Sequence, residues 1–310
     1  MVLNQNFKKL GDCMRIISRP DFDGIVCAAL LYEAENITGP VKWVQPGDMQ
    51  KGLVDIEESD IIANLPYDPK CALWFDHHYT NQPGSSFKGL YKMAPSAAGV
   101  IFEYYKCRFR HDYRELIYQT DKIDSADLSM DEVVQPEKYD YITLSMTVSG
   151  RDKKDEPYWN KLAMLLRKCH ISDVLNEPEV KERCKKVVEQ NKEFKQLLLE
   201  YTRIEKHIAI TDFRPLKKSA TGNRFLVYPL FPQSVVSMRI SYLSDDQDKV
   251  TISVGHNIFN QKCNVNVGRM LAMFEGGGHR GAGGCCFHVS KADEYIPRII
   301  DILLKNEPDE

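Results

Sequence analysis

Residues 71–78 read Cys-Ala-Leu-Trp-Phe-Asp-His-His, an apolar run that ends abruptly in one acidic and two histidine side chains. A short apolar run without polar alternation is typical of a strand buried on both faces of a parallel sheet. In α/β proteins the ligand lies at the carboxyl ends of such strands. The triplet Asp76, His77 and His78 therefore comes where a functional site is expected.

The chemistry of this triplet narrows the kind of site. One carboxylate and two imidazoles combine oxygen with nitrogen ligands, a set that suits Mn, Fe or Zn better than Ca. A carboxylate beside a ligating histidine can also fix the imidazole tautomer. The simpler interpretation is two surface histidines in a loop, and it stays open at this point.

Strand-like runs and helical patterns alternate through the first half of the chain. Three further apolar runs precede the triplet, at 14–17, 41–44 and 61–63. The spacing of apolar residues predicts helices that begin just after Gly24, at the N-cap Ser96 and at residue 113. This alternation indicates an α/β domain with a parallel sheet and right-handed crossovers.

Two acidic pairs follow predicted elements of this domain. Asp21 and Asp23 lie at a strand-to-helix turn, and two nearby carboxylates repel each other unless a cation lies between them. Asp121 and Asp124 lie at the end of the predicted helix over 113–124, and Asp124 could complete a metal shell. Capping or turn chemistry for the first pair, and a solvated turn for the second, are the alternatives.

The second half begins with a long amphipathic helix and then becomes rich in strand-like runs. The helix spans 180–201, and packing on one domain is favoured over an intermolecular coiled coil, which would make a homodimer. The predicted strands are 207–210, 225–228, 235–242 and 250–254, and a helix over 292–304 follows them.

A glycine-rich segment lies in this second domain, with six glycines among residues 275–284. Glycines allow backbone N–H groups to close on a phosphate, and His279 and Arg280 add donors and charge. Phosphate binding is favoured over a flexible hinge loop.

Composition limits the function classes. The 310 residues suffice for two domains, and a formal net charge of −3 provides no long-range basic field for duplex DNA. The longest strongly apolar stretch without a charge, residues 24–32, is too short to span a membrane, and residues 1–13 lack a signal-peptide core. Nine scattered cysteines without a Cys-x-x-Cys pair indicate reduced thiols. We therefore expect a cytoplasmic protein without membrane or duplex-DNA partners.

These motifs, in this order, resemble the DHH phosphoesterase family with its DHH-associated C-terminal domain, and most of all its exopolyphosphatase-related branch. That branch stands beside RecJ-like nucleases, nanoRNases and phosphoadenosine-phosphate phosphatases. The resemblance covers nearly the whole chain. It implies an α/β fold with a parallel-sheet DHH domain at 1–165, a helical linker at 166–205 and a smaller mixed α/β substrate-binding domain at 206–310.

The family's roles transfer residue by residue. The resemblance implies one or two ions of Mn²⁺, or Mg²⁺ or Co²⁺, held by Asp21, Asp23, His77 and Asp124, with Asp121 as the alternative last ligand. Asn64 is included among the implied metal residues. Asp76, His77 and His78 are the implied catalytic residues, with Asp76 and His78 supporting His77 or facing the phosphate. The implied substrate loop contains these residues: Gly276, Gly277, Gly278, His279, Arg280 and Gly283.

Two positions depart from the family pattern. No histidine shortly precedes Asp21, and Asn64 stands where the family has an aspartate that bridges two metals. Asn64 can offer a carbonyl oxygen but no negative charge. The first metal site is therefore expected to be weak, unless Asp68 or a substrate phosphate supplies the charge.

The expected function is metal-dependent hydrolysis of phosphate ester or anhydride bonds at a cleft between two domains. Expected substrates are small phosphorylated molecules or short oligonucleotides, such as phosphoadenosine phosphate, cyclic dinucleotides or, less favoured, polyphosphate. The rival is a catalytically weakened member that binds a nucleotide or phosphate and regulates. A manganese pyrophosphatase is disfavoured because Lys217-Lys218-Ser219 is not the Ser-Arg-Lys-Lys type motif of those enzymes, and a scaffolding role would leave the acidic clusters unexplained.

Overall fold

The computed structural model describes residues 14–150, 152–216, 220–243 and 247–308. Residues 1–13, and the segment Lys217-Lys218-Ser219, lie outside the described residues. The chain divides into two compact units, one of 1–127 with 137–185 and one of 128–136 with 186–310.

The first unit is built on a five-stranded sheet in the order β2-β1-β3-β4-β5. All neighbouring strands are parallel. The strands are β1 (Arg15–Ser18), β2 (Lys42–Trp43), β3 (Asp60–Ala63), β4 (Leu73–Asp76) and β5 (Gly89–Tyr91). Ser18 pairs with Ala63, and Ala63 pairs with Phe75, so the three central strands end at the same edge of the sheet.

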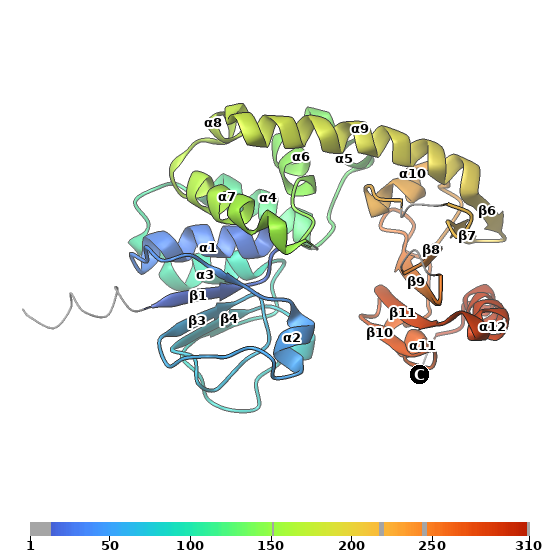
Figure 1. The fold of residues 1–310 in the computed structure, drawn as a ribbon, viewed down its shortest axis with the longest axis horizontal. Coiled ribbons are helices and arrows are strands. Elements are labelled where there is room, and N and C mark those ends of the chain that lie inside the picture. Colours follow the sequence, from blue (N-terminus) through green and yellow to red (C-terminus); the bar gives the residue numbers. More distant parts are fainter. Residues whose placement is uncertain (1–13, 151, 217–219, 244–246, 309–310) are drawn as a thin grey trace, which may run out of the picture. The chain divides into compact units, whose positions relative to one another are not determined.

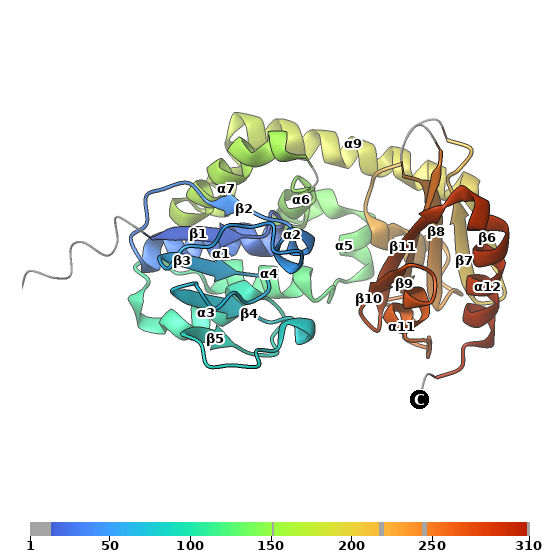
Figure 2. The same ribbon diagram turned by 60° about the horizontal axis from the view of Figure 1, so that its bottom comes forward.

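Alternate residues of these strands enter two separate cores, as expected for a sheet that is covered on both faces. Ile16 and Ile61 pack with the helices, whereas Ile17, Ile62 and Trp74 pack on the opposite face. Figures 1 and 2 show helices α1, α3, α4 and α7 layered on one side of this sheet. The expected α/β class with a parallel N-terminal sheet is confirmed.

Three helices of the first unit, α1, α3 and α4, begin where the sequence predicts helices, and four more among the described residues were not predicted. The helices are α1 (Phe22–Ala34), α2 (Pro46–Gln50), α3 (Ala97–Tyr105), α4 (Arg114–Asp124), α6 (Asp140–Met146), α7 (Glu156–Lys168) and α8 (Ile171–Asn176). Short 3₁₀ turns are η1 (Tyr79–Asn81), η2 (Lys106–Arg108) and η4 (Lys153–Asp155). Asp21 caps α1 by accepting from the Gly24 amide, and Ser96 caps α3 as predicted.

The second unit contains a mixed six-stranded sheet in the order β10-β11-β9-β8-β7-β6. Only the β7–β8 pair is parallel among the described strands of this sheet. Its strands are β6 (Thr202–Glu205), β7 (Ile208–Asp212), β8 (Val236–Tyr242), β9 (Lys249–His256), β10 (Gly276–Gly278) and β11 (Ala282–His288). Its helical elements are α5 (Met130–Val134), η5 (Arg224–Leu226), α10 (Val227–Leu230), α11 (Val267–Ala272), η6 (Val289–Lys291) and α12 (Ala292–Lys305), and the 3₁₀ turn η3 (Pro136–Lys138) crosses the boundary between the units. The long helix α9 (Pro178–Tyr201) begins in the first unit and continues into the second.

One predicted strand is wrong: residues 225–228 are helical and belong to η5 and α10. Asn223 caps this turn by accepting from the Phe225 amide. Leu226, Val227 and Tyr228 are buried in a core that includes Phe194 of α9. A four-residue apolar run fits either a buried strand or a buried helical turn, and the cap decides for the helix here.

Candidate metal centre of the first unit

The candidate site lies at the shared carboxyl edge of the sheet. Asp21 and Asp23 follow β1, Asn64 follows β3, and His77 follows β4. Because the register aligns these strand ends, polar residues separated by more than fifty positions converge there.

Asp23 is buried and held by the start of a neighbouring helix. Its carboxylate accepts the backbone N–H groups of Ala97 and Ala98, at 2.9 and 2.8 Å, in the first turn of α3. Burial raises the pKa of Asp23 to about 6, even though His77 and the two amides act in the opposite direction. A cation beside this carboxylate would therefore stabilise its charged form.

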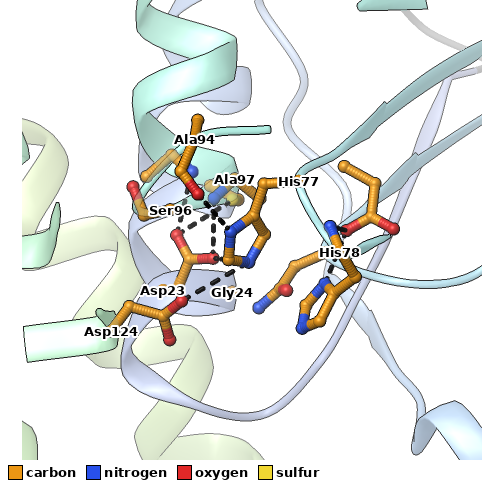
Figure 3. A network of polar contacts seen from close by, with 12 residues as sticks. Asp23, Gly24, His77, His78, Ala94, Ser96, Ala97 and Asp124 are labelled. Carbon is orange, nitrogen blue, oxygen red and sulfur yellow. Dashed lines mark hydrogen bonds and ion pairs between the residues drawn. The ribbon is translucent and has the colours of Figure 1, made fainter. Parts of the chain in front are cut away.

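His77 presents one ring nitrogen to two carboxylates. Its Nδ1 lies 2.9 Å from the carbonyl oxygen of Ala94, so Nδ1 carries the proton and donates it. Its Nε2 lies 3.4 Å from Asp124 Oδ2 and 3.8 Å from Asp23 Oδ2. Figure 3 shows one nitrogen of the His77 ring facing these two carboxylates, with the Ala94 carbonyl at the other ring nitrogen. Nε2 is buried and has no hydrogen-bond partner among the described residues.

This arrangement fits a metal ion. Two ligands that each lie about 2.1 Å from an ion are roughly 3 to 3.5 Å apart, close to the two separations seen here. Asp23, His77 and Asp124 each offer one ligand atom, and these atoms all lie within 4.8 Å of one another. The carbonyl of Ala94 fixes the tautomer that leaves a lone pair on Nε2, as such acceptors commonly do for ligating histidines. The orphaned nitrogen therefore has the environment of a ligand atom.

Asp76 has a different task from the other acids. It is fully buried, its Oδ1 lies 2.8 Å from His78 Nδ1, and its Oδ2 accepts from Asn81 Nδ2 at 2.6 Å. Burial, the largest single influence, would lower the pKa of His78, but the hydrogen bond to Asp76 and the negative charge of that carboxylate together outweigh burial and raise the pKa. Asp76 therefore orients His78 rather than joining His77, although the triplet is also close enough to be a ligand group.

The structure separates the two candidates for the last ligand. Asp124 lies at the end of α4 with Oδ2 facing His77. Asp121, one turn earlier, instead accepts from the Ser96 hydroxyl at 2.5 Å and so ties α4 to the cap of α3. The structure thus brings Asp124, and not Asp121, to His77.

The remaining first-motif residues lie beside this cluster. Asp21 accepts from the Asn64 side-chain amide at 3.0 Å, and its other oxygen pairs with Arg19 Nε at 2.8 Å. Asn64 is buried, and its Oδ1 has no hydrogen-bond partner within the described part of the chain. Asp68, the expected substitute for a bridging carboxylate, accepts from the Lys70 amide in a turn and belongs to neither ligand group of the described residues.

The glycine-rich segment is a hairpin rather than an open loop. Gly276–Gly278 pairs with β11, and the His279 amide donates to the carbonyl of Ala282. A Cβ on Gly278, whose φ is +147°, would lie 2.4 Å from the Ala282 oxygen, and one on Gly268 would lie 2.3 Å from the Gly278 oxygen. Close backbone packing thus explains glycine at these positions. The substrate-binding role of this hairpin in the second unit stays a prediction.

Three residues at the site carried no signal that the sequence argument used. Asn81 and Ala94 hold the Asp76–His78 pair and His77 through one hydrogen bond each, and Arg19 pairs with Asp21.

Comparison with known proteins shows which proteins this chain is similar to. No family model and no curated protein matches it. A solved structure of a pGpG-specific phosphodiesterase, PggH from Vibrio cholerae, is 30% identical over 95% of this chain and 100% of that chain, with a TM-score of 0.80. An exopolyphosphatase-related protein from Bacteroides fragilis shares the fold, with 14% identity, a TM-score of 0.55, and coverage of 97% of this chain and 96% of that chain. RecJ from Thermus thermophilus in complex with Mn²⁺ does so at 13% identity and a TM-score of 0.57, over 96% of this chain and 52% of that chain.

The similarity to PggH, at 30% identity over 95% of this chain, is high enough to define the protein family. The chain belongs to the DHH family of phosphoesterases, as its motifs indicated. Within the described residues, no helix is both long and apolar enough to cross a membrane.

Proposed function

We propose that this protein is a divalent-metal-dependent phosphodiesterase that hydrolyses short 5′-phosphorylated oligonucleotides, with the dinucleotide pGpG as the first candidate substrate. The observation that carries the proposal is the orphaned Nε2 of His77, aimed at the carboxylates of Asp23 and Asp124. A triad of this kind, at the strand ends of a phosphoesterase fold, is suited to hold a cation against a phosphate.

The choice of pGpG rests on similarity along the whole chain. PggH is described as specific for pGpG, and this chain matches all of it at 30% identity. The ordinary net charge of −3 also favours a short substrate over a long polyanion. Cleavage of the single internucleotide phosphodiester of pGpG by water releases two molecules of GMP.

We assign metal binding and phosphate contact to different residues of the first unit. A divalent ion held by Asp23, His77 and Asp124 would neutralise a phosphate oxygen and lower the pKa of the attacking water. Asp76 holds the ring of His78 at Nδ1 and is itself held by Asn81. We assign the other ring nitrogen of His78 to the phosphate, where it can stabilise developing charge. Mn²⁺ is the first ion to test, because mixed carboxylate and imidazole ligands suit it.

The test is product release from a small substrate panel. The panel contains pGpG, longer 5′-phosphorylated oligonucleotides, phosphoadenosine phosphate, cyclic dinucleotides and polyphosphate, each with Mn²⁺, Mg²⁺ or chelator. The proposal expects GMP from pGpG only when metal is present. Metal-independent turnover, or turnover of polyphosphate alone, would contradict it.

A second candidate function is regulatory binding of a nucleotide without turnover. It is favoured by Asn64, which places an amide where the family has a bridging carboxylate, and by the engagement of Asp21 with protein donors. Tight binding of pGpG by folded, metal-loaded protein, with no GMP released over the panel, would favour this candidate.

A further inference from the structure

The first-motif carboxylate Asp21 is already satisfied by the protein. Its Oδ1 accepts from the Gly24 amide at 2.9 Å and from Asn64 Nδ2 at 3.0 Å, and its Oδ2 pairs with Arg19 Nε at 2.8 Å. Asp21 also stays outside both groups of possible metal ligands among the described residues. Asp21 therefore differs from Asp23, which faces an imidazole nitrogen with no hydrogen-bond donor between them.

The amide of Asn64 can lie beside the Asp21 carboxylate without a metal ion between them. Asn64 is buried at 1% exposure and has a left-handed backbone with φ of +57°, which asparagine tolerates better than most residues. A carboxylate in place of its amide would lie about 3 Å from Asp21 and repel it unless a cation intervened. The amide Nδ2 donates a hydrogen bond to Asp21 instead, so the two side chains attract each other without an ion between them, although Asn64 Oδ1 has no hydrogen-bond partner among the described residues.

Arg19 supplies positive charge at the same place. Its Nε is fixed by Asp21, while its terminal nitrogens have no hydrogen-bond partner among the described residues. The backbone at Arg19 is also fixed, because the Asp21 amide donates to its carbonyl and Gly24 lies against that oxygen, where a Cβ would come within 1.9 Å. The side chain is 39% exposed, so its outer face is open to a ligand.

We propose that this protein holds one divalent ion, at Asp23, His77 and Asp124, and that the Arg19 guanidinium takes the place of a second cation beside Asp21. The role of Arg19 toward a phosphate rests on the proposed function, whereas the number of ions does not. Arg19 is suited to this role because a guanidinium is always charged and its planar donors match two phosphate oxygens.

The number of ions is measured on the full-length protein without substrate. Mn²⁺ titration by calorimetry, and metal content after equilibrium dialysis, should give one ion per chain. The electron paramagnetic resonance spectrum should show isolated Mn²⁺ and no exchange-coupled pair. Two ions per chain, a coupled pair, or no bound ion would each overturn the proposal.

A double variant tests whether Arg19 and Asn64 exclude the second ion. Arg19→Ala/Asn64→Asp removes the guanidinium and adds a carboxylate beside Asp21, so this variant should bind two Mn²⁺ ions and show exchange coupling. Arg114→Ala, which removes a guanidinium whose side chain is 80% exposed at the start of α4, is the matched control and should bind one. A folded double variant that still binds a single ion would overturn the assignment to these two residues.

The anion-binding role of Arg19 is tested with inorganic phosphate as the probe. Arg19→Ala should weaken phosphate binding to Mn²⁺-loaded protein by about 10- to 100-fold. Arg19→Lys should weaken it by less, because lysine keeps the positive charge but lacks the two parallel N–H donors of the guanidinium. Equal affinity for wild type and Arg19→Ala would remove Arg19 from the site. These binding measurements do not depend on turnover. A protein that binds one ion but has no phosphodiesterase activity would contradict the proposed function and leave the proposal of a single ion intact.

Discussion

At the scale of single residues, the nitrogen Nε2 of His77 is the atom that points most directly to metal binding. His77 Nε2 lies within 4 Å of two carboxylate oxygens and accepts no hydrogen bond from the described residues. A nitrogen lone pair and two carboxylates repel one another unless a proton or a metal ion lies between them. The separations of 3.4 and 3.8 Å exceed a hydrogen bond and leave room for the larger cation.

His77→Ala should remove metal binding. The loss in Mn²⁺ affinity should exceed the roughly 10- to 100-fold that removing a group behind a ligand costs, because His77 is itself a proposed ligand. Calorimetric titration with Mn²⁺ measures it. The control is His288→Ala, an exposed histidine at the end of β11 in the second unit, which should bind Mn²⁺ as wild type does. Unchanged affinity in His77→Ala would place the ion elsewhere.

Asp121 and Asp124 give a second residue-scale contrast. Asp124→Asn should weaken Mn²⁺ binding because it removes a charged oxygen 3.4 Å from His77 Nε2. Asp121→Asn should leave the Mn²⁺ affinity within a few-fold of wild type and instead lower stability by about 1 kcal/mol, because it weakens the bond from Ser96. Mn²⁺ titration and urea denaturation of both variants check this. The reverse ranking of metal affinities would show that Asp121 is the ligand.

Only some of the site residues could be predicted from the sequence. Asp23 and His77 could be named because each belongs to a compact motif directly after a strand, whereas Asp124 could be named only with Asp121 as the alternative, because both lie in the last turn of the same predicted helix. Asn81, Ala94 and Arg19 were out of reach, because their importance comes from hydrogen bonds and an ion pair that only the folded chain forms.

At the scale of elements, α1 carries the site at one end and a buried acid at the other. Glu33, in the last turn of α1, accepts from the hydroxyl of Tyr113, from His111 Nδ1 and from the Arg110 amide. Burial alone would raise the pKa of Glu33, but these hydrogen bonds outweigh it and lower the pKa to about 2. This cluster anchors the end of α1 that is farthest from Asp21 and Asp23.

Glu33→Gln should destabilise the protein by about 1 to 3 kcal/mol at neutral pH. The pKa of Glu33 is lower in the folded state than its ordinary value of 4.5, so its contribution is present above pH 4.5 and is lost as the pH falls toward 2. The difference in free energy of unfolding between wild type and variant should therefore shrink from pH 7 to pH 3. Urea denaturation at both values measures it, with the exposed Glu103→Gln as control. An equal difference at both pH values would contradict this assignment.

Helix α9 offers a test of packing in the second unit. Phe194 is 2% exposed and its ring lies 5.8 Å from that of Phe213, whereas Leu199 on the same helix is 49% exposed. Phe194→Ala should cost about 3 to 5 kcal/mol, and Leu199→Ala about 0.5 kcal/mol or less. Urea denaturation of the two variants compares them. Similar losses would mean that the buried face of α9 is not the one described.

The elements themselves differ in how far the sequence could predict them. The β1, β3 and β4 runs are largely apolar and could be predicted, because a sheet covered on both faces needs no alternation. The short strand β5 could not, since Gly89–Tyr91 has little apolar signal. The helical segment at 225–228 was mistaken for a strand, because its length fits either state and its packing against α9 is a tertiary effect.

For the whole molecule, we expect the divalent ion to stabilise the folded state. An ion that binds only folded protein adds about 2.7 kcal/mol at a free concentration 100 times its dissociation constant. Mn²⁺ should therefore raise the midpoint of thermal unfolding of wild type but not of His77→Ala, as differential scanning calorimetry would show. Stabilisation of both proteins to the same extent would point to a different ion site.

The central claim is that the Asp23, His77 and Asp124 cluster performs metal-dependent hydrolysis of a phosphodiester. The most direct measurement is GMP release from pGpG by wild type and His77→Ala, with Mn²⁺ and with chelator. We expect release by metal-loaded wild type only, with no release by the folded variant or after chelation. Equal GMP release by wild type and His77→Ala would contradict it.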